Sequence, residues 1–478
     1  MSALSSPTVS ATVAKATPLW KPVGAALIGN TLEWFDLSVY AYFALTISKV
    51  FFPAADPAVS LFLAFATFGL SFLIRPLGAA VLGSYADREG RKKALTLSIM
   101  LMLIGTAMIA VMPSYAAIGI IAPIGILLAR LLQGFSAGGE FGSSTAFMME
   151  HAPQKTRNFV ASLQFASQGF GVVIASLFGY FLTTNLNDQQ MFDWGWRVPF
   201  FFGLILAPVG LYIRSTVDES PDFKESQPGS RPLREVLLSQ KTLLLVAMGV
   251  LIVSTASNFM IKYMPSYAST TLDIPQSTGF LATLSGGLIL TVVTPVVGFI
   301  TGYVSRIKIM LWASSIYILA IFPAFAWLNR VPSATSLLLV VSMMALIKAV
   351  YFAPLASLMA DVFPVRTRVT GMSLSYNLAV TIFGGFAPVI ATGLIALTGG
   401  PEGPIGQAIN ADQPALAQAR CDILAKLFGD RLYIELQRHG LENERRVESA
   451  LIDMAYAMGL PLVATNQPYF ATADDYEA

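Results

Sequence analysis

The sequence is poor in charge, cysteine and histidine. Charged residues make up 12% of its 478 residues, and there are one cysteine, Cys421, and two histidines, His151 and His439. A lone cysteine forms no internal disulfide, and two distant histidines give no local metal motif. Hydrophobic residues make up 55% of the chain. We therefore expect no metal and no cofactor, and the composition argues against a soluble globule, a disordered chain, a metalloenzyme and a thiol-redox enzyme.

The few charges are distributed unevenly. Residues 1–400 contain 24 Lys and Arg and 16 Asp and Glu, whereas residues 401–478 contain 6 and 12. The first region is basic and the second acidic, and the second is also much richer in charge. Two regions of different character therefore share the chain.

The first region divides into eleven apolar runs, each long enough for the roughly 20 helical residues that cross a bilayer. We predict spans at 22–47, 58–86, 94–112, 117–147, 158–183, 195–214, 242–267, 278–303, 307–328, 333–360 and 368–398. These runs predict an all-α membrane protein.

Basic residues indicate the orientation of these spans. With residues 1–21 inside, 17 Lys and Arg fall on the cytoplasmic side and 3 on the other. Positive residues near span ends stay in the cytoplasm, so we predict a cytoplasmic N-terminal segment, and no cleavable signal peptide is evident. A polar segment rich in proline, 215–241, separates a six-span bundle, 22–214, from a five-span bundle, 242–398.

The two halves share a short repeat. Acid, proline and arginine recur at the same spacing at the ends of the fourth and tenth spans, as Glu150, Pro153 and Arg157 and as Asp361, Pro364 and Arg368. A parallel repeat of two helical bundles, with a site between them near the bilayer midplane, is how many secondary transporters are built. The repeat predicts that architecture.

Ionisable residues inside the spans are the first candidates for the site, because such groups are costly in a membrane unless paired or wetted. Glu33 and Asp36 lie on one face of the first span near mid-depth, and Arg75 reaches a comparable depth in the second. We expect Arg75 to pair with these acids. It could bind a substrate carboxylate while an acid carries the proton; a permanent structural ion pair is the alternative.

Other polar residues inside the spans are weaker candidates. Lys348 could supply a second cation for a di- or tricarboxylate or pair elsewhere, whereas Lys262 is expected to extend to the outer surface. Polar side chains that could line the cavity or simply join helices are Asn258, Tyr263, Gln164, Gln168 and Asn377.

A loop motif follows the second span. It consists of Gly83, Asp87, Arg88, Gly90, Arg91 and Lys92. Gly90 suits a tight turn, and the Asp87 carboxylate could cap or release a neighbouring helix end. An ordinary positive loop would explain the cations but not the acid and the spaced glycines. The segment resembles the cytoplasmic gate loop of the major facilitator superfamily. A second copy, Gly298 to Arg306, lacks the acid, so the gate of the second half is in doubt.

Further motifs narrow the resemblance. They are Gly29–Asp36, Arg75–Gly78, Arg130–Gly134 within Arg130–Gly142, and Trp194–Phe200. Together they resemble the metabolite:proton symporter family, which carries citrate, 2-oxoglutarate, shikimate, and proline or betaine. The resemblance implies that Arg130 takes part in proton coupling. Deep in its span, this arginine must face a cavity or a partner. Small residues after it, from Gly134 to Gly142, predict close helix packing.

The resemblance implies a secondary active transporter, not an enzyme. We expect proton-coupled symport of a small organic acid across the bacterial inner membrane, by a monomer working by alternating access in the bilayer. Within the family, proline or betaine uptake is the alternative. An efflux carrier, a sensor without transport and a non-functional fusion product also remain open.

Residues 399–478 do not continue the membrane pattern, so a twelfth span is expected to be absent. We predict a short α/β segment with a strand at 432–436, a helix at 442–458 and a strand at 462–465. The segment resembles a piece of the PHP domain of the bacterial DNA polymerase III alpha subunit. Its acidic character argues against binding nucleic acid. A chimeric gene joined near 397–401 is the simplest explanation, and a real fusion is the alternative.

Overall fold

A computed structural model describes residues 19–53, 57–219, 231–270, 272, 274–385, 404–428, 433–436 and 442–464. The chain divides into two compact units, 1–385 and 386–478. Each unit is described by itself.

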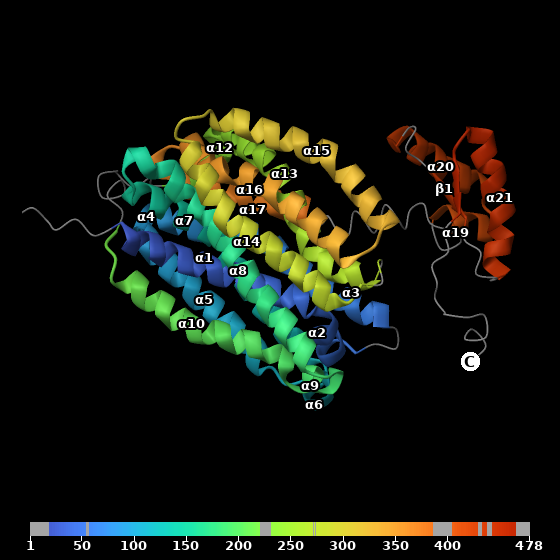
Figure 1. Cartoon of the computed structure of the whole chain (residues 1–478), viewed down its shortest axis with the longest axis horizontal. Helices are drawn as coiled ribbons and strands as arrows, with labels where there is room; N and C mark the ends of the chain where they lie inside the picture. Colours follow the sequence, from blue (N-terminus) through green and yellow to red (C-terminus); the bar gives the residue numbers. More distant parts are fainter. Residues whose placement is uncertain are drawn as a thin grey trace, which may run out of the picture. The chain divides into compact units, whose positions relative to one another are not determined.

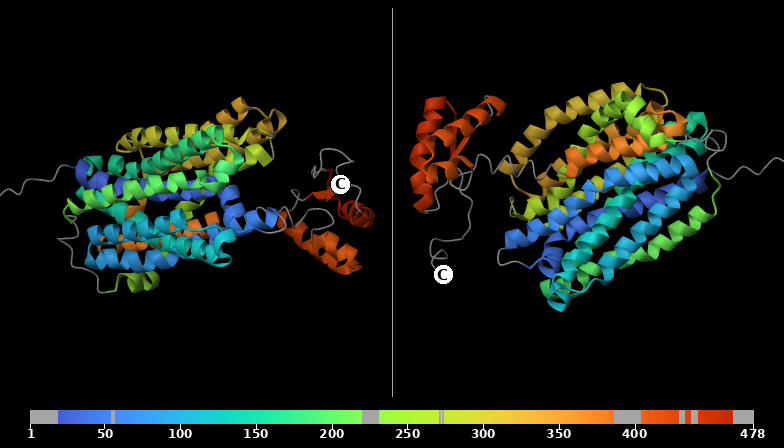
Figure 2. Two further views of the ribbon diagram at one scale, coloured as in Figure 1. Left: turned by 90° about the horizontal axis from the view of Figure 1, so that it is seen from below. Right: turned by 180° about the vertical axis from the view of Figure 1, so that it is seen from behind.

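The first unit is a bundle of long helices that run roughly along one direction (Figures 1 and 2). Its first half contains α1 (Trp20–Tyr42), α2 (Ala44–Phe51), α3 (Pro57–Leu73), α4 (Arg75–Glu89), α5 (Arg91–Val111), α6 (Tyr115–Ile118), α7 (Ile121–His151), α8 (Arg157–Asn185), α9 (Asp188–Asp193) and α10 (Val198–Ser215). Its second half contains α12 (Pro232–Ser239), α13 (Lys241–Thr270), α14 (Gln276–Ile300), α15 (Arg306–Arg330), α16 (Ala334–Val362) and α17 (Arg368–Val380), followed by a π-helical turn, Thr381–Gly385.

In the described part of the chain, nine helical segments are long and apolar enough to cross a membrane. They correspond to nine of the eleven predicted spans. The first predicted span appears as α1 and α2, which are separated at Phe43. The last contains α17 and the π-helical turn, and its remainder lies outside the described residues. Large apolar side chains on α15, including Phe322 at 80% exposure, point away from the bundle, as expected for a surface that faces lipid.

Two local features differ from the predicted spans. The second span breaks at Ile74, directly before Arg75 and Pro76, because proline lacks the N–H that would continue the helical hydrogen bonds. Within the predicted linker, α12 forms a helix because Val236 is buried against Leu244 and Leu374. That contact is tertiary and leaves no mark in the linker's polar composition.

The halves of the bundle contact each other along several helix pairs. Helix α8 packs against α14 and α16, while α4 and α7 pack against α17. Ser176 and Thr283 exchange a hydrogen bond of 3.0 Å between α8 and α14. Helices from both halves therefore surround the centre of the bundle, where the site residues lie.

The second unit is a small α/β structure with its own apolar core. Helices α19 (Pro404–Asn410), α20 (Pro414–Phe428) and α21 (Glu442–Met458) accompany two strands, β1 (Ile434–Leu436) and β2 (Leu462–Ala464). The strands pair in parallel, with Ile434 opposite Leu462. The predicted helix at 442–458 and both predicted strands are present, although residues 429–432 and 465 lie outside the description. The resemblance to a PHP domain stays a prediction.

Candidate functional site

An ion pair connects α1 and α4 inside the bundle. Arg75 Nη1 lies 3.4 Å from Glu33 Oε1, and the two side chains are 2% and 5% exposed. The α3–α4 break puts Arg75 at the first position of α4. Its guanidinium also stacks 4.5 Å from the Phe72 ring. The predicted pairing of Arg75 with an acid of the first span is thus present for Glu33.

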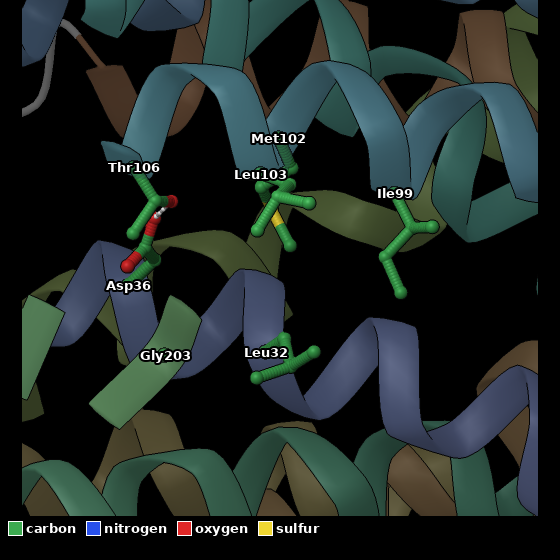
Figure 3. Close-up of a pocket in the computed structure, with 7 residues that line it drawn as sticks. All are labelled: Leu32, Asp36, Ile99, Met102, Leu103, Thr106 and Gly203. Atoms are coloured by element: carbon green, nitrogen blue, oxygen red, sulfur yellow. Dashed lines mark hydrogen bonds between the residues drawn. The ribbon is translucent and has the colours of Figure 1, made fainter. Parts of the chain in front are cut away.

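Asp36 belongs to a different polar network. It accepts hydrogen bonds from Thr106 on α5 and from Gln133 on α7 through Oδ2, while its other oxygen, Oδ1, has no hydrogen-bond partner among the described residues. Figure 3 shows the Thr106 contact beside a small pocket that is also lined by Leu32, Ile99, Met102, Leu103 and Gly203. Asp36 therefore does not share the partner of Glu33. Glu33 pairs with Arg75, whereas Asp36, less than one turn further along α1, bonds to Thr106 and Gln133.

Arg130 is linked to Asp36 through Gln133. Its Nη1 donates to Gln133 Oε1 at 2.8 Å, and its Nη2 donates to Ser71 Oγ at 3.2 Å. The guanidinium also lies 4.4 Å from the centre of the Tyr40 ring. This buried arginine therefore has partners, as its depth in the span requires, and its charge lies in the same network as Asp36.

Glu140 is a buried acid that the sequence reasoning did not select. It accepts a hydrogen bond from Ser98 and lines a narrow crevice with Glu33 and Ser136. Position 140 follows Gln133 by two helical turns, so the period of α7 was a signal that could have placed it on the same inner face.

A second cavity, which we call the central cavity, lies between helices of the two halves. Aromatic residues line it, among them Trp34, Phe72, Phe165, Phe352 and Tyr376. The polar residues around it are Gln168, Ser254, Thr255, Asn258 and Lys262. The central cavity combines residues of α1, α3 and α8 with residues of α13, α16 and α17.

The two membrane lysines are both directed inward. Lys348 is 3% exposed and donates from Nζ to Asn258 Oδ1 at 2.7 Å. Lys262 lines the central cavity, with its Nζ 4.3 Å from the centre of the Trp34 ring. The expectation that Lys262 extends to the outer surface is wrong, because α13 turns this residue toward α1, where the indole face attracts the ammonium group.

The remaining polar candidates divide into two groups. Asn258 and Gln168 line the central cavity. Gln164 instead bonds to Asn30 at 2.9 Å, and Asn377 bonds to the Gly138 carbonyl at 2.7 Å, so both join helices. The side chain of Tyr263 lies outside the described residues.

The loop motif after α4 forms a cluster with residues of the second half. Asp87 accepts hydrogen bonds from the Thr370 N–H at 2.8 Å and from the Val369 N–H at 3.3 Å, so it caps the start of α17. Gly90 has φ +113°, which a glycine adopts without strain. We call Asp87, Arg91, Glu150 and Arg368 the gate cluster.

Arginines complete the gate cluster. Arg91 Nε lies 3.2 Å from Glu150 Oε2, and Arg368 Nη1 lies 3.1 Å from Glu150 Oε1. Arg91 also donates to the Val365 carbonyl at 2.9 Å. Of the other motif residues, Gly83 packs closely against Thr370, Lys92 donates to the Ser215 carbonyl at 3.0 Å, and Arg88 is exposed.

The second copy of the motif makes a simpler contact. Arg306 lies 2.7 Å from Asp361, which corresponds to the contact of Arg91 with Glu150. Where the first copy has Asp87, the second has Gly302, and here Asn158 donates to the Thr301 carbonyl at 3.2 Å. The first copy therefore caps a helix of the opposite half with a carboxylate, and the second forms a neutral hydrogen bond.

Comparison with known proteins now identifies the family. The family described as "Sugar (and other) transporter" matches residues 23–227. The chain is 35% identical over 381 residues to a citrate-proton symporter of Salmonella typhi, covering 79% of this chain and 87% of that protein. The chain belongs to the major facilitator superfamily. It is a multi-pass membrane transporter and not an enzyme.

Other relatives agree with the motifs. The chain is 33% identical over 386 residues to an alpha-ketoglutarate permease of Escherichia coli K12, covering 79% of the chain and 87% of the permease. It is 35% identical over 394 residues to a proline/betaine transporter of Salmonella typhimurium, covering 79% and 78%. The predicted membership of the metabolite:proton symporter group is confirmed.

Solved structures agree on the fold. The proton:xylose symporter XylE matches with a TM-score of 0.67 and 17% identity, over 86% of this chain and 94% of that chain. At this identity, the likeness extends to the fold alone.

Proposed function

We propose that the chain is a proton-coupled symporter that moves a small organic acid across the bacterial inner membrane. Citrate and 2-oxoglutarate are the substrates we test first. The observation that carries this proposal is the buried Arg75–Glu33 pair, in which Arg75 stacks on Phe72, a residue that lines the central cavity. A guanidinium can bind a carboxylate with two parallel hydrogen bonds, so protonation of Glu33 would release Arg75 for the substrate.

Two features support an anion with more than one negative charge. Lys262 and Lys348 both lie at the central cavity or one contact from it. Citrate-proton symporters and an alpha-ketoglutarate permease are also among the relatives. Proton and substrate would then enter together, because the anion can displace Glu33 from Arg75 only when the acid is neutral.

Betaine or proline uptake is the second candidate function. The aromatic lining of the central cavity supports it. Trp34, Phe165 and Tyr376 could surround a quaternary ammonium group. Lys262 in the same lining would repel that group. An organic acid therefore fits the charges of the cavity better.

The proposal is tested in proteoliposomes. We expect an inward proton gradient to drive uptake of labelled citrate or 2-oxoglutarate, and a protonophore to abolish accumulation. A Glu33→Gln/Asp36→Asn double variant should lose gradient-driven accumulation but keep substrate exchange, because it removes the proton-binding groups and leaves Arg75. Asp188→Asn, at an exposed acid of α9, is the control. Accumulation by the double variant would contradict the coupling, and uptake of betaine alone would favour the second candidate.

A further inference from the structure

Two lysines inside the bundle have no carboxylate within 4.0 Å among the described side chains. Lys348 on α16 is buried and Lys262 on α13 is half-buried. Arg75, by contrast, pairs with Glu33. Burying a cation costs several kcal/mol unless a partner compensates it. Lys348 and Arg75 repel the Lys262 ammonium group, while Glu33 attracts it from beyond ion-pair distance. The burial of Lys348 without a carboxylate in contact favours an anionic ligand nearby.

The contacts that the lysines do make hold them without neutralising them. Lys348 donates to Asn258 Oδ1 at 2.7 Å, and Asn258 lies one helical turn before Lys262 on α13. Ring faces attract both ammonium groups, with Lys262 Nζ 4.3 Å from Trp34 and Lys348 Nζ 4.9 Å from Phe352. Cation–π attraction and one amide oxygen position an ammonium group but carry no negative charge.

The lysines and Arg75 approach the central cavity from different halves. Arg75 stacks on Phe72, which lines the cavity on the side of the first half. Lys262 and Asn258 line it on the side of the second half, and Asn258 connects to Lys348. Positive charge at two separated places suits a ligand with two separated negative ends.

We propose that Lys262 and Lys348 form a subsite for the second carboxylate of the substrate. This inference rests on the proposed function, and it assigns to the lysines the discrimination between dicarboxylates and monocarboxylates. Arg75 binds the first carboxylate. Trp34, from the first half, holds Lys262 in place until the distal carboxylate arrives, so that a two-ended anion joins the halves across the cavity.

The test compares two substrates of equal chain length, 2-oxoglutarate and the monocarboxylate 2-oxopentanoate, in proteoliposomes of the full chain. In wild type, we expect a KM for 2-oxoglutarate at least about tenfold below that for 2-oxopentanoate. Lys262→Gln and Lys348→Gln should each raise the KM for 2-oxoglutarate by about tenfold and leave that for 2-oxopentanoate nearly unchanged, because only the dicarboxylate loses a contact. Lys262→Arg keeps the charge and should keep the discrimination.

A control variant and a second measurement distinguish failure of the lysine subsite from failure of the proposed function. Lys49→Gln changes an exposed lysine of α2 and should leave both KM values unchanged. If the glutamine variants fail to fold, inhibition of wild-type 2-oxoglutarate uptake by glutarate and by pentanoate serves instead, and glutarate should inhibit about tenfold more strongly. Equal inhibition, or an unchanged substrate ratio in an active Lys262→Gln variant, would overturn the subsite alone. A wild type that accumulates no carboxylate would overturn the proposed function as well.

Discussion

Arg130 illustrates how a single buried charge is held at the residue scale. Its guanidinium donates to Gln133 and Ser71 with different nitrogens while its face lies against Tyr40. Gln133 in turn donates to Asp36. The planar fork of arginine therefore connects three helices to one acid, which a single ammonium group does not reproduce.

Replacing this arginine with lysine keeps the charge and removes the fork. We expect Arg130→Lys to lower gradient-driven uptake by about tenfold or more, because Gln133 and Ser71 cannot both keep a partner. Substrate exchange at equal pH should fall less, because lysine keeps the positive charge at this position. Initial rates of the two modes check this, with the exposed Arg330→Lys as the control. An equal loss in both modes would point to a folding defect.

The sequence predicted the partners of buried charges where the depth of the charge in the membrane requires a partner. Arg75 and Arg130 had to find partners, because a charge at mid-depth is costly, and both have them. The prediction for Lys262 was wrong because a lysine that far along a span can extend to the outer surface or turn inward. The packing of α13 against α1 decides which of the two happens. Asp36 was grouped with Glu33 for its spacing, yet the donors Thr106 and Gln133 come from other helices.

At the scale of elements, the small residues of α7 allow three other helices to approach it. A Cβ at Gly134 would overlap the backbone of Ser71 on α3, one at Gly138 that of Arg75 on α4, and one at Gly142 would overlap Val369 on α17. The predicted small-residue face of the fourth span is therefore a packing surface. It also positions Arg75, since Gly138 lies directly against that residue.

A single methyl group tests this packing surface. We expect Gly138→Ala to destabilise the protein by about 1–3 kcal/mol, the usual cost of overpacking, because the overlapping atoms are backbone and cannot swing away. The melting temperature in detergent should fall. Gly249→Ala, on α13, has no atom within 4 Å of the new methyl group and serves as the control. A Gly138→Ala variant as stable as this control would show that α4 and α7 can separate freely.

The gate cluster makes a second prediction for elements. Asp87 caps α17 from inside the protein, whereas Asp361 pairs with Arg306 at a largely exposed position. Asp87→Asn keeps an acceptor for the cap but removes the buried charge that pairs with Arg91 and interacts with the N-terminus of α17, an interaction worth up to about 2 kcal/mol. An exposed ion pair is worth about 0–1 kcal/mol. We therefore expect Asp87→Asn to open this end of the bundle and Asp361→Asn to have little effect.

The readout is labelling of a buried position behind the gate cluster. Ser373 on α17 packs against Gly142, so Ser373→Cys in a Cys421→Ser background reports opening. Asp87→Asn should speed its modification by up to about tenfold, which corresponds to about 1.4 kcal/mol. Equal labelling in the Asp87→Asn and Asp361→Asn variants would count against a special role for the helix cap.

At the scale of the whole molecule, the bilayer made much of the first unit predictable. Span length is a physical requirement of a membrane, so the long apolar runs predicted the nine helical segments that are long and apolar enough to cross it in the described part of the chain. The contact between Arg306 and Asp361 was not predicted. The break before Pro76 and the helix α12 could not be predicted from span length alone. A proline can kink or end a helix, and α12 depends on Val236 meeting residues far along the chain.

The second unit yields the last prediction, through the chain's one cysteine. Cys421 on α20 lies in that unit's apolar core with Ile434 and Val447. Burial, together with the neighbouring carboxylate of Asp422, raises the pKa of the thiol. The thiolate is the reactive form, so a raised pKa lowers its fraction at neutral pH, and the reaction should accelerate as the pH rises toward that pKa.

We therefore expect N-ethylmaleimide to modify Cys421 slowly in the native protein at pH 7 and much faster in urea, followed by mass spectrometry of the intact chain. Urea removes the larger cause of the raised pKa, because it exposes the thiol, whereas Asp422 stays its neighbour in the sequence. Asp422→Asn should speed the native reaction only modestly, because burial is the larger cause. Equally fast labelling with and without urea would mean that residues 404–464 do not form a stable core, which would favour a fragment joined to the transporter over a domain that folds by itself.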